Sequence, residues 1–121
     1  MRLALIAHDE QKSALVEFAD KHVDLLEQFE CMATGSTSDQ LNQETDLEVE
    51  QLESGSLGGD LMIGAAVATD DCDAVIFLRD PLTAQPHEPD IMALLRVCDV
   101  HNVPFATNLS SADAILNHLV N

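Results

Sequence analysis

The chain has 121 residues, a hydrophobic content of 46% and a formal net charge of −17 at pH 7, which predicts one folded domain over 1–121 and excludes an intrinsically disordered chain. Only 5 residues are Lys or Arg, against 22 Asp or Glu, so the composition argues against nucleic acid and against an anionic membrane surface as partners. The apolar run at 1–7 is too short for a signal peptide, and we expect a cytoplasmic protein.

The first half of the chain alternates strand and helix patterns. A continuous apolar run at 3–7 predicts a strand that is covered on both faces. Apolar residues at helical spacing from Leu15 to Phe29 predict one amphipathic helix. Weaker patterns predict a strand at 31–34, a helix at 37–44 and a strand at 48–52.

The second half continues this alternation with clearer patterns. After the glycine-rich segment SGSLGGD at 54–60, the sequence predicts a mostly buried helix at 61–68 and a strand at 73–78. A helix at 90–100, a strand at 103–107 and a helix at 112–120 complete the chain. Consecutive parallel strands need a crossover connection, so the alternation predicts a three-layer α/β fold, with a five-stranded parallel sheet and helices on both faces.

Three cysteines, Cys31, Cys72 and Cys98, lie in or beside apolar segments. Their odd number and wide spacing favour buried free thiols in a reducing compartment. Their spacing matches no metal-binding motif, and we expect no metal site.

Polar residues follow each predicted strand, at the edge where ligands bind in an open α/β sheet. They are His8 and Asp9, Thr34 to Thr37, Ser54 and Gly55, then Asp80, His87 and Asp90, and finally Thr107 and Asn108. Topology alone predicts a site at this edge, so the residue types are needed to identify its chemistry.

The residue types at this edge point to a phosphate. TGST at 34–37 and SGSLGG at 54–59 offer hydroxyl and N–H groups just before a helix, which suits a bound phosphate. Helix capping and glycine turns are the alternative explanation of either loop.

Lys12 lies in the first turn of a helix, where a cation opposes the helix dipole unless an anion is present. His87 stands between two prolines, either as a structural residue or as an acid or base.

Six segments of the chain carry a resemblance to a known family, in the family's order and with similar spacing. They are ALIAHDEQK, ATGST, SGSLGGD, FLRDPLTAQPHEPD, ALLRVCDV and VPFATN. With these segments the chain resembles methylglyoxal synthases over nearly its whole length. The resemblance implies a Rossmann-like domain, generally in a homohexamer, that converts dihydroxyacetone phosphate to methylglyoxal and inorganic phosphate without metal or organic cofactor.

The resemblance also implies roles for individual residues. Asp60 matches the catalytic base, and His87 matches the group that polarises the substrate oxygens and shuttles their protons. Asp9, Asp80 and Asp90 match acids that surround the site and orient its histidines and loops. Residues that match contacts to the substrate, chiefly to its phosphate, are His8, Lys12, Thr34, Gly35, Ser36, Thr37, Ser54, Gly55 and His87.

The chain departs from the family pattern at several positions. Ser56 stands where proline is usual, and Leu61-Met62 where two glutamines are usual. Ser36 and Ser38 stand where Thr and Gly are usual, and Ser36 keeps the hydroxyl that a phosphate contact needs.

Two further interpretations concern function and environment. Similar domains serve as non-catalytic regulatory modules of larger enzymes, where they bind an effector. Such a module is the alternative to an enzyme, although it would need no base at Asp60.

The excess of Asp and Glu is typical of proteins from very salty cytoplasms, so the composition suggests a halophilic organism.

Overall fold

The computed structural model describes residues 1–54, 57–84 and 88–120, apart from the side chains of 88–90, and its centre is a parallel sheet. The strand order is β3-β2-β1-β4-β5, and every neighbouring pair is parallel. The strands are β1 (Arg2–Ala7), β2 (Glu30–Thr34), β3 (Val49–Leu52), β4 (Ala74–Leu78) and β5 (Phe105–Ala106). The predicted three-layer α/β architecture is confirmed.

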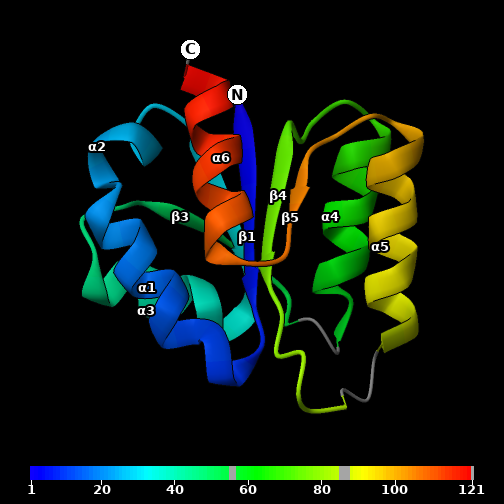
Figure 1. The fold of residues 1–121 in the computed structure, drawn as a ribbon, viewed down its shortest axis with the longest axis horizontal. Coiled ribbons are helices and arrows are strands. Elements are labelled where there is room, and N and C mark those ends of the chain that lie inside the picture. Colours follow the sequence, from blue (N-terminus) through cyan, green and yellow to red (C-terminus); the bar gives the residue numbers. More distant parts are fainter. Residues whose placement is uncertain (55–56, 85–87, 121) are drawn as a thin grey trace.

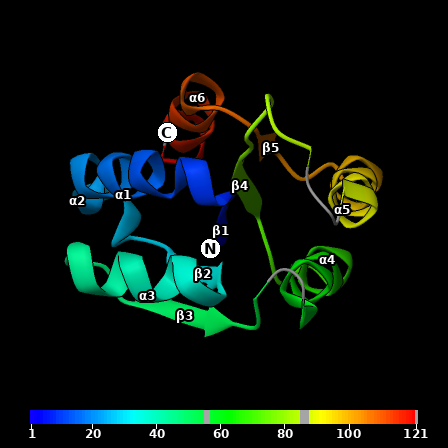
Figure 2. The same ribbon diagram turned by 90° about the horizontal axis from the view of Figure 1, so that it is seen from below.

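Helices cover both faces of this sheet (Figure 1). One face carries α1 (Lys12–Lys21), α2 (Val23–Leu26), α3 (Gly35–Glu44) and α6 (Leu109–Val120), and the other carries α4 (Gly59–Ala68) and α5 (Glu88–Val100). A short 3-10 turn, η1 (Asp9–Gln11), precedes α1. Figure 2, seen from below, shows the two helical layers on either side of the strands. In the described ranges no helix is both long and apolar enough to span a bilayer.

Strand β1 runs through the middle of the sheet and supplies both cores. Leu3 and Leu5 pack beneath α1, α2, α3 and α6, whereas Ala4 and Ile6 pack beneath α4 and α5. Because successive side chains of a strand point to opposite faces, a strand covered on both sides must be apolar throughout. This explains the continuous apolar run at 3–7.

The prediction of one helix from Leu15 to Phe29 is wrong, because the structure divides this segment at His22. The N–H of His22 closes α1 by donating to the carbonyl of Phe18 at 3.1 Å, and the His22 carbonyl accepts the N–H of Leu26 at 3.0 Å. A new turn therefore starts at His22 and brings the fully buried Leu26 into the core before β2. The apolar periodicity continues through the break since α1 and α2 face the same core.

Several element ends also differ from the prediction. Helices α3, α4, α5 and α6 begin two or three residues earlier than the apolar pattern does. The early residues of α3, α4 and α5 are glycine, proline or polar and carry no apolar periodicity, and in α6 the exposed Leu109 is followed by two serines. Strand β5 is limited to Phe105–Ala106. As a consequence Asp60 is the second residue of α4 and belongs to a helix rather than to a loop.

Candidate functional site

The carboxyl edge of the sheet, where the strands end, holds the buried polar groups of the molecule. In the described part of the chain, every buried polar or charged side chain lies at the end of a strand or in the segment that follows it, at this edge. They are His8, Thr34, Thr37, Ser38, Asp60 and Asp80. Burying polar groups costs free energy unless they are satisfied, so their concentration at one edge marks a candidate site.

His8 directly follows β1 and is fixed from β4. Its backbone N–H donates to the Leu78 carbonyl at 3.1 Å, and its Nδ1 accepts the backbone N–H of Asp80 at 2.8 Å. The ring also meets Phe77 edge to face, with centroids 5.1 Å apart. A nitrogen that accepts a hydrogen bond carries no hydrogen, so the neutral imidazole is protonated at Nε2 and presents that nitrogen as a donor.

Asp80 links this histidine to the loop that follows β4. It is 8% exposed, and its carboxylate Oδ1 accepts the backbone N–H of Leu82 at 3.1 Å. The backbone N–H of Asp80 thus contacts His8, while the Asp80 side chain contacts the loop.

Lys12 extends from the start of α1 to the loop after β2. Its Nζ lies 2.8 Å from Asp9 Oδ1 and donates to the Ser36 hydroxyl. The hydrogen bond and charge of Lys12 lower the pKa of Asp9 below its usual value. Asp9 is thus the anion that offsets the unfavourable position of a lysine at a helix N-terminus, and Lys12 holds a positive charge beside the TGST loop.

The two glycine-containing loops pack tightly against each other. A Cβ on Gly35 would lie 2.9 Å from Ser54 Cα, and a Cβ on Gly59 would lie 2.1 Å from the Glu53 carbonyl oxygen and 2.8 Å from Thr34 Cγ2. The Ser38 hydroxyl also donates to the Gly35 carbonyl at 2.7 Å. Glycine is required at these positions because the ends of β2 and β3 approach so closely.

Asp60 directly follows these two closely packed loops. Gly58 precedes α4 with φ of 106°, a left-handed conformation that favours glycine. The Gly59 N–H then donates to the Ser54 carbonyl at 2.9 Å. These constraints place Asp60 in the first turn of α4, where the helix dipole favours a carboxylate, with 2% of its surface exposed.

Two of the hollows along the carboxyl edge adjoin the predicted site residues. One is lined by Gly35, Ser36 and Ser54, together with Leu57 and Met62. The other is lined by residues of the segments 8–10 and 80–84. The described part of the chain contains no group of three or more His, Cys, Asp or Glu side chains placed to hold a metal ion.

The structure places most of the predicted site residues at this one edge. They are His8, Asp9, Lys12, Thr34, Gly35, Ser36, Thr37, Ser54, Asp60 and Asp80. Gly55 and His87 lie outside the described residues, and Asp90 falls in the first turn of α5, with its side chain likewise outside them.

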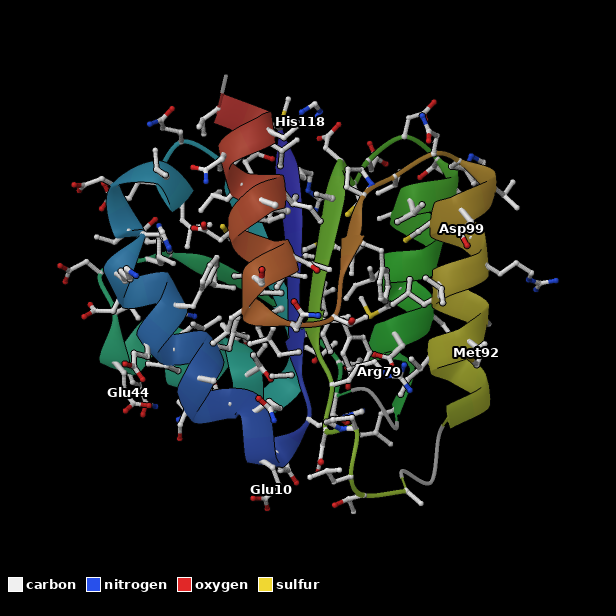
Figure 3. The ribbon with its side chains drawn as sticks, viewed as in Figure 1. Glu10, Glu44, Arg79, Met92, Asp99 and His118 are labelled. Atoms are coloured by element: carbon white, nitrogen blue, oxygen red, sulfur yellow. The ribbon has the colours of Figure 1, made fainter. Side chains whose placement is uncertain are left out.

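Sequence reasoning missed two residues at this edge. Arg79 directly follows β4 and lines a third hollow with Thr107 and Asn108; Figure 3 shows it at the lower end of that strand. The scarcity of arginine in this chain is a signal that could have identified it. Ser38 was noted only as a departure from the family, and its hydrogen bond to Gly35 has no local sequence signal.

The chain is similar to a known protein family and to individual members of it. The MGS-like domain family matches residues 14–107. The chain is 56% identical over 119 residues to a methylglyoxal synthase of Moorella thermoacetica, covering 98% of this chain and 93% of the relative. It is 49% identical over 119 residues to that of Bacillus subtilis, covering 98% and 87%.

A solved structure supports the same assignment. The crystal structure of methylglyoxal synthase from Elizabethkingia anophelis superimposes with a TM-score of 0.90 at 41% identity, covering 95% of this chain and 76% of that one. Sequence and fold agree over nearly the full length. The chain therefore belongs to the methylglyoxal synthase family of lyases.

Proposed function

We propose that the chain converts dihydroxyacetone phosphate to methylglyoxal and inorganic phosphate, without metal or organic cofactor. The observation that carries the proposal is the position of Asp60, a carboxylate 2% exposed at the start of α4, immediately after two interleaved loops suited to a phosphate. A base and an anion site are thus joined in one short segment, as this reaction requires.

Asp60 acts as the base that removes a proton from the carbon beside the ketone. An exposed aspartate, with a pKa of about 3.9, is a weak base in water, so its effect depends on placement and on partial exclusion of water. Its burial and its attachment to a rigid helix start support this role.

The charge that develops on the substrate oxygens needs hydrogen-bond donors. His87 has this role by resemblance, polarising the oxygens of the enediolate and moving their protons. His8 is suited to assist, because the Asp80 N–H occupies its Nδ1 and leaves Nε2 as the donor nitrogen. Asp9, Asp80 and Asp90 support these groups.

The phosphate binds at the ends of β2 and β3. Lys12 supplies a positive charge there, already in contact with Ser36. The remaining contacts come from Thr34, Gly35, Thr37, Ser54 and Gly55. Since phosphate is also the leaving group that the enediolate expels, the groups that bind it stabilise its departing charge as well.

Release of phosphate from dihydroxyacetone phosphate by the purified protein tests the activity. Asp60→Asn should lower kcat by about 10²- to 10⁴-fold and leave binding of inorganic phosphate intact. Asp99→Asn makes the same chemical change at an exposed position near the far end of α5 (Figure 3) and should leave turnover unchanged. Equal turnover in Asp60→Asn and the native chain would contradict the assignment of the base.

The alternative is a domain that binds a phosphate-containing effector and catalyses nothing. Its loops would serve equally well, but a buried carboxylate beside an anion site would hinder binding without a compensating use. If the native protein binds inorganic phosphate and releases none from the substrate, the binding module is the correct interpretation.

We further propose a cytoplasmic homohexamer from a halophilic organism, on the basis of family resemblance and composition. At 1 M salt the screening length is about 3 Å, against about 10 Å at 0.1 M, so the repulsion between a chain of charge −17 and an anionic substrate is largely removed. The KM should fall between about 0.1 and 2 M KCl. A KM that is lowest at low salt, in fully folded protein, would refute the screening argument.

A further inference from the structure

The hollow at the ends of β2 and β3 has two sides of different chemistry. Ser36 and Ser54, from the segments that follow these strands, contribute hydroxyl groups to its lining. Leu57 and Met62, from the approach to α4 and its first turn, contribute apolar side chains. We call it the Ser54 hollow, and its volume of about 450 Å³ lies within the range of small-molecule sites.

Backbone hydrogen bonds hold the apolar side in place. The Leu57 N–H donates to the Ser54 carbonyl at 2.9 Å, and the Met62 N–H donates to the Gly58 carbonyl at 3.0 Å. The side chains themselves remain open to solvent, with exposed fractions of 72% for Leu57 and 44% for Met62. An anion that binds at the Ser54 hydroxyl therefore has these two apolar groups beside it.

An apolar group beside an anion displaces water and donates no hydrogen bond in return, which costs free energy. Every oxygen of inorganic phosphate needs a donor or a water molecule. A phosphate ester instead turns one of its oxygens to a carbon chain, and this chain can lie against apolar side chains. The apolar side of the hollow therefore costs the ester less than it costs inorganic phosphate.

We propose that Leu57 and Met62 make the Ser54 hollow select phosphate esters over inorganic phosphate. This inference rests on the proposed function and deepens it, because the substrate is an ester and inorganic phosphate is a product. Asp60 belongs to the same first turn of α4 as Met62, so the carbon chain that reaches the base leaves the phosphate on the apolar side. The side that accepts the substrate thus weakens the hold on the product.

The carboxylates of the hollow do not account for such a selection. Asp39 and Glu53 also line it and are exposed. Their negative charge opposes the ester and inorganic phosphate alike, because both are anions. The difference between the two ligands therefore depends on the apolar side chains.

Position 62 allows a mild test of the apolar side. Met62→Gln introduces an amide donor, the side chain that methylglyoxal synthases usually carry there, and a partly exposed position tolerates polar substitution. Leu61→Gln is the matched control. Leu61 is the neighbouring residue, is 62% exposed and lies outside the lining of the Ser54 hollow as far as the structure describes it.

Titration calorimetry with two probes measures the selection without turnover. The probes are inorganic phosphate and glycerol 3-phosphate, an ester that lacks the ketone and so gives Asp60 no activated proton. In Met62→Gln the dissociation constant of inorganic phosphate should fall about tenfold, the equivalent of 1.4 kcal/mol, because the amide adds a hydrogen bond to a charged group. That of glycerol 3-phosphate should change much less.

The two control variants should show no gain in phosphate binding. Leu61→Gln adds its amide outside the hollow, and Met62→Leu keeps the side apolar. An unchanged affinity for inorganic phosphate in Met62→Gln, an equal gain in Leu61→Gln, or an equal gain for both probes overturns the proposal. Failure of the native chain to release phosphate from dihydroxyacetone phosphate would contradict the proposed function alone, since neither titration depends on turnover.

Discussion

Polar side chains are buried at one edge of the sheet and stay partly exposed at the other. At the carboxyl edge, the described polar side chains include six that are buried, among them His8, Asp60 and Asp80. At the amino edge, where the strands begin, charged groups surround Arg2 and remain partly exposed. Arg2 Nη2 contacts Glu50 Oε2 at 2.8 Å, and its backbone N–H donates to Asp73 Oδ2 at 2.8 Å.

This difference separates a site from a structural connection. The contacts of Arg2 join β1 to β3 and to the segment before β4, and exposed ion pairs of this kind contribute modestly to stability. Buried polar groups cost free energy unless they are satisfied, so a fold concentrates them only where they have another use. The burial of polar groups, more than their number, distinguishes the functional edge.

The largest loss of stability is expected when a side chain is added to a glycine at the carboxyl edge. In Gly59→Ala the new Cβ would lie 2.1 Å from the Glu53 carbonyl oxygen, and backbone atoms cannot yield cheaply, so unfolding should become easier by about 3 kcal/mol. Urea denaturation measures this change. Gly64→Ala, later in α4, places its Cβ 3.9 Å from Leu94 and should stabilise the protein by up to about 1 kcal/mol. Equal effects of the two variants would contradict the close approach of the loops.

A second prediction concerns substrate binding at the same edge. Lys12→Gln removes the positive charge beside Ser36, and loss of one charged hydrogen bond of about 1.5–3 kcal/mol should raise KM by roughly tenfold or more. Lys21→Gln changes the other lysine of the chain, exposed at the end of α1, and serves as the control in steady-state kinetics. A KM that responds equally to both changes would mean that net charge, not position, governs binding.

A substitution at the amino edge should lower stability and leave the kinetics of the enzyme unchanged. Arg2→Met removes the contacts to Glu50 and to the Asp71 carbonyl, and should lower the free energy of unfolding by about 1–2 kcal/mol with kcat and KM unchanged. Arg96→Met makes the same change of charge at an exposed position on α5 and should alter neither. A kinetic defect in Arg2→Met would remove the distinction between the edges.

Ionisation of the buried thiols should have the smallest effect on stability at neutral pH. Burial raises the pKa of Cys31, at the beginning of β2, to about 11 and that of Cys98 to about 12, from the ordinary value of 9.0. The unfolded chain ionises first as pH rises, so this contribution to stability is complete below pH 9 and is lost as pH approaches 11. The chain has no tyrosine, so few other groups titrate in this range.

Unfolding followed as a function of pH tests this sign. Stability should decline from about pH 9 upward, and Cys31→Val should decline less steeply than the native chain. An increase in stability over this interval would show that the thiols do not titrate as their burial implies.

Much of the fold could be predicted because periodicity is a local property. The run at 3–7 predicts a strand covered on both faces, and the alternation of strands and helices predicts the parallel sheet. The division at His22 could not be predicted, since α1 and α2 continue one apolar pattern toward one core. The start of α4 at Gly59 could not be predicted either, because Gly59 and Asp60 add nothing to the apolar pattern of the helix.

The sequence by itself determined the class of the sheet and the edge at which the polar residues gather, because both follow from the order of local patterns along the chain. Only the tertiary structure decided how those residues act on each other. The Asp80 N–H reaches His8 across 72 positions, and Gly35 meets Ser54 only because β2 and β3 are neighbours. Contacts between residues so distant in sequence depend on strand order and side-chain packing, which no local pattern contains.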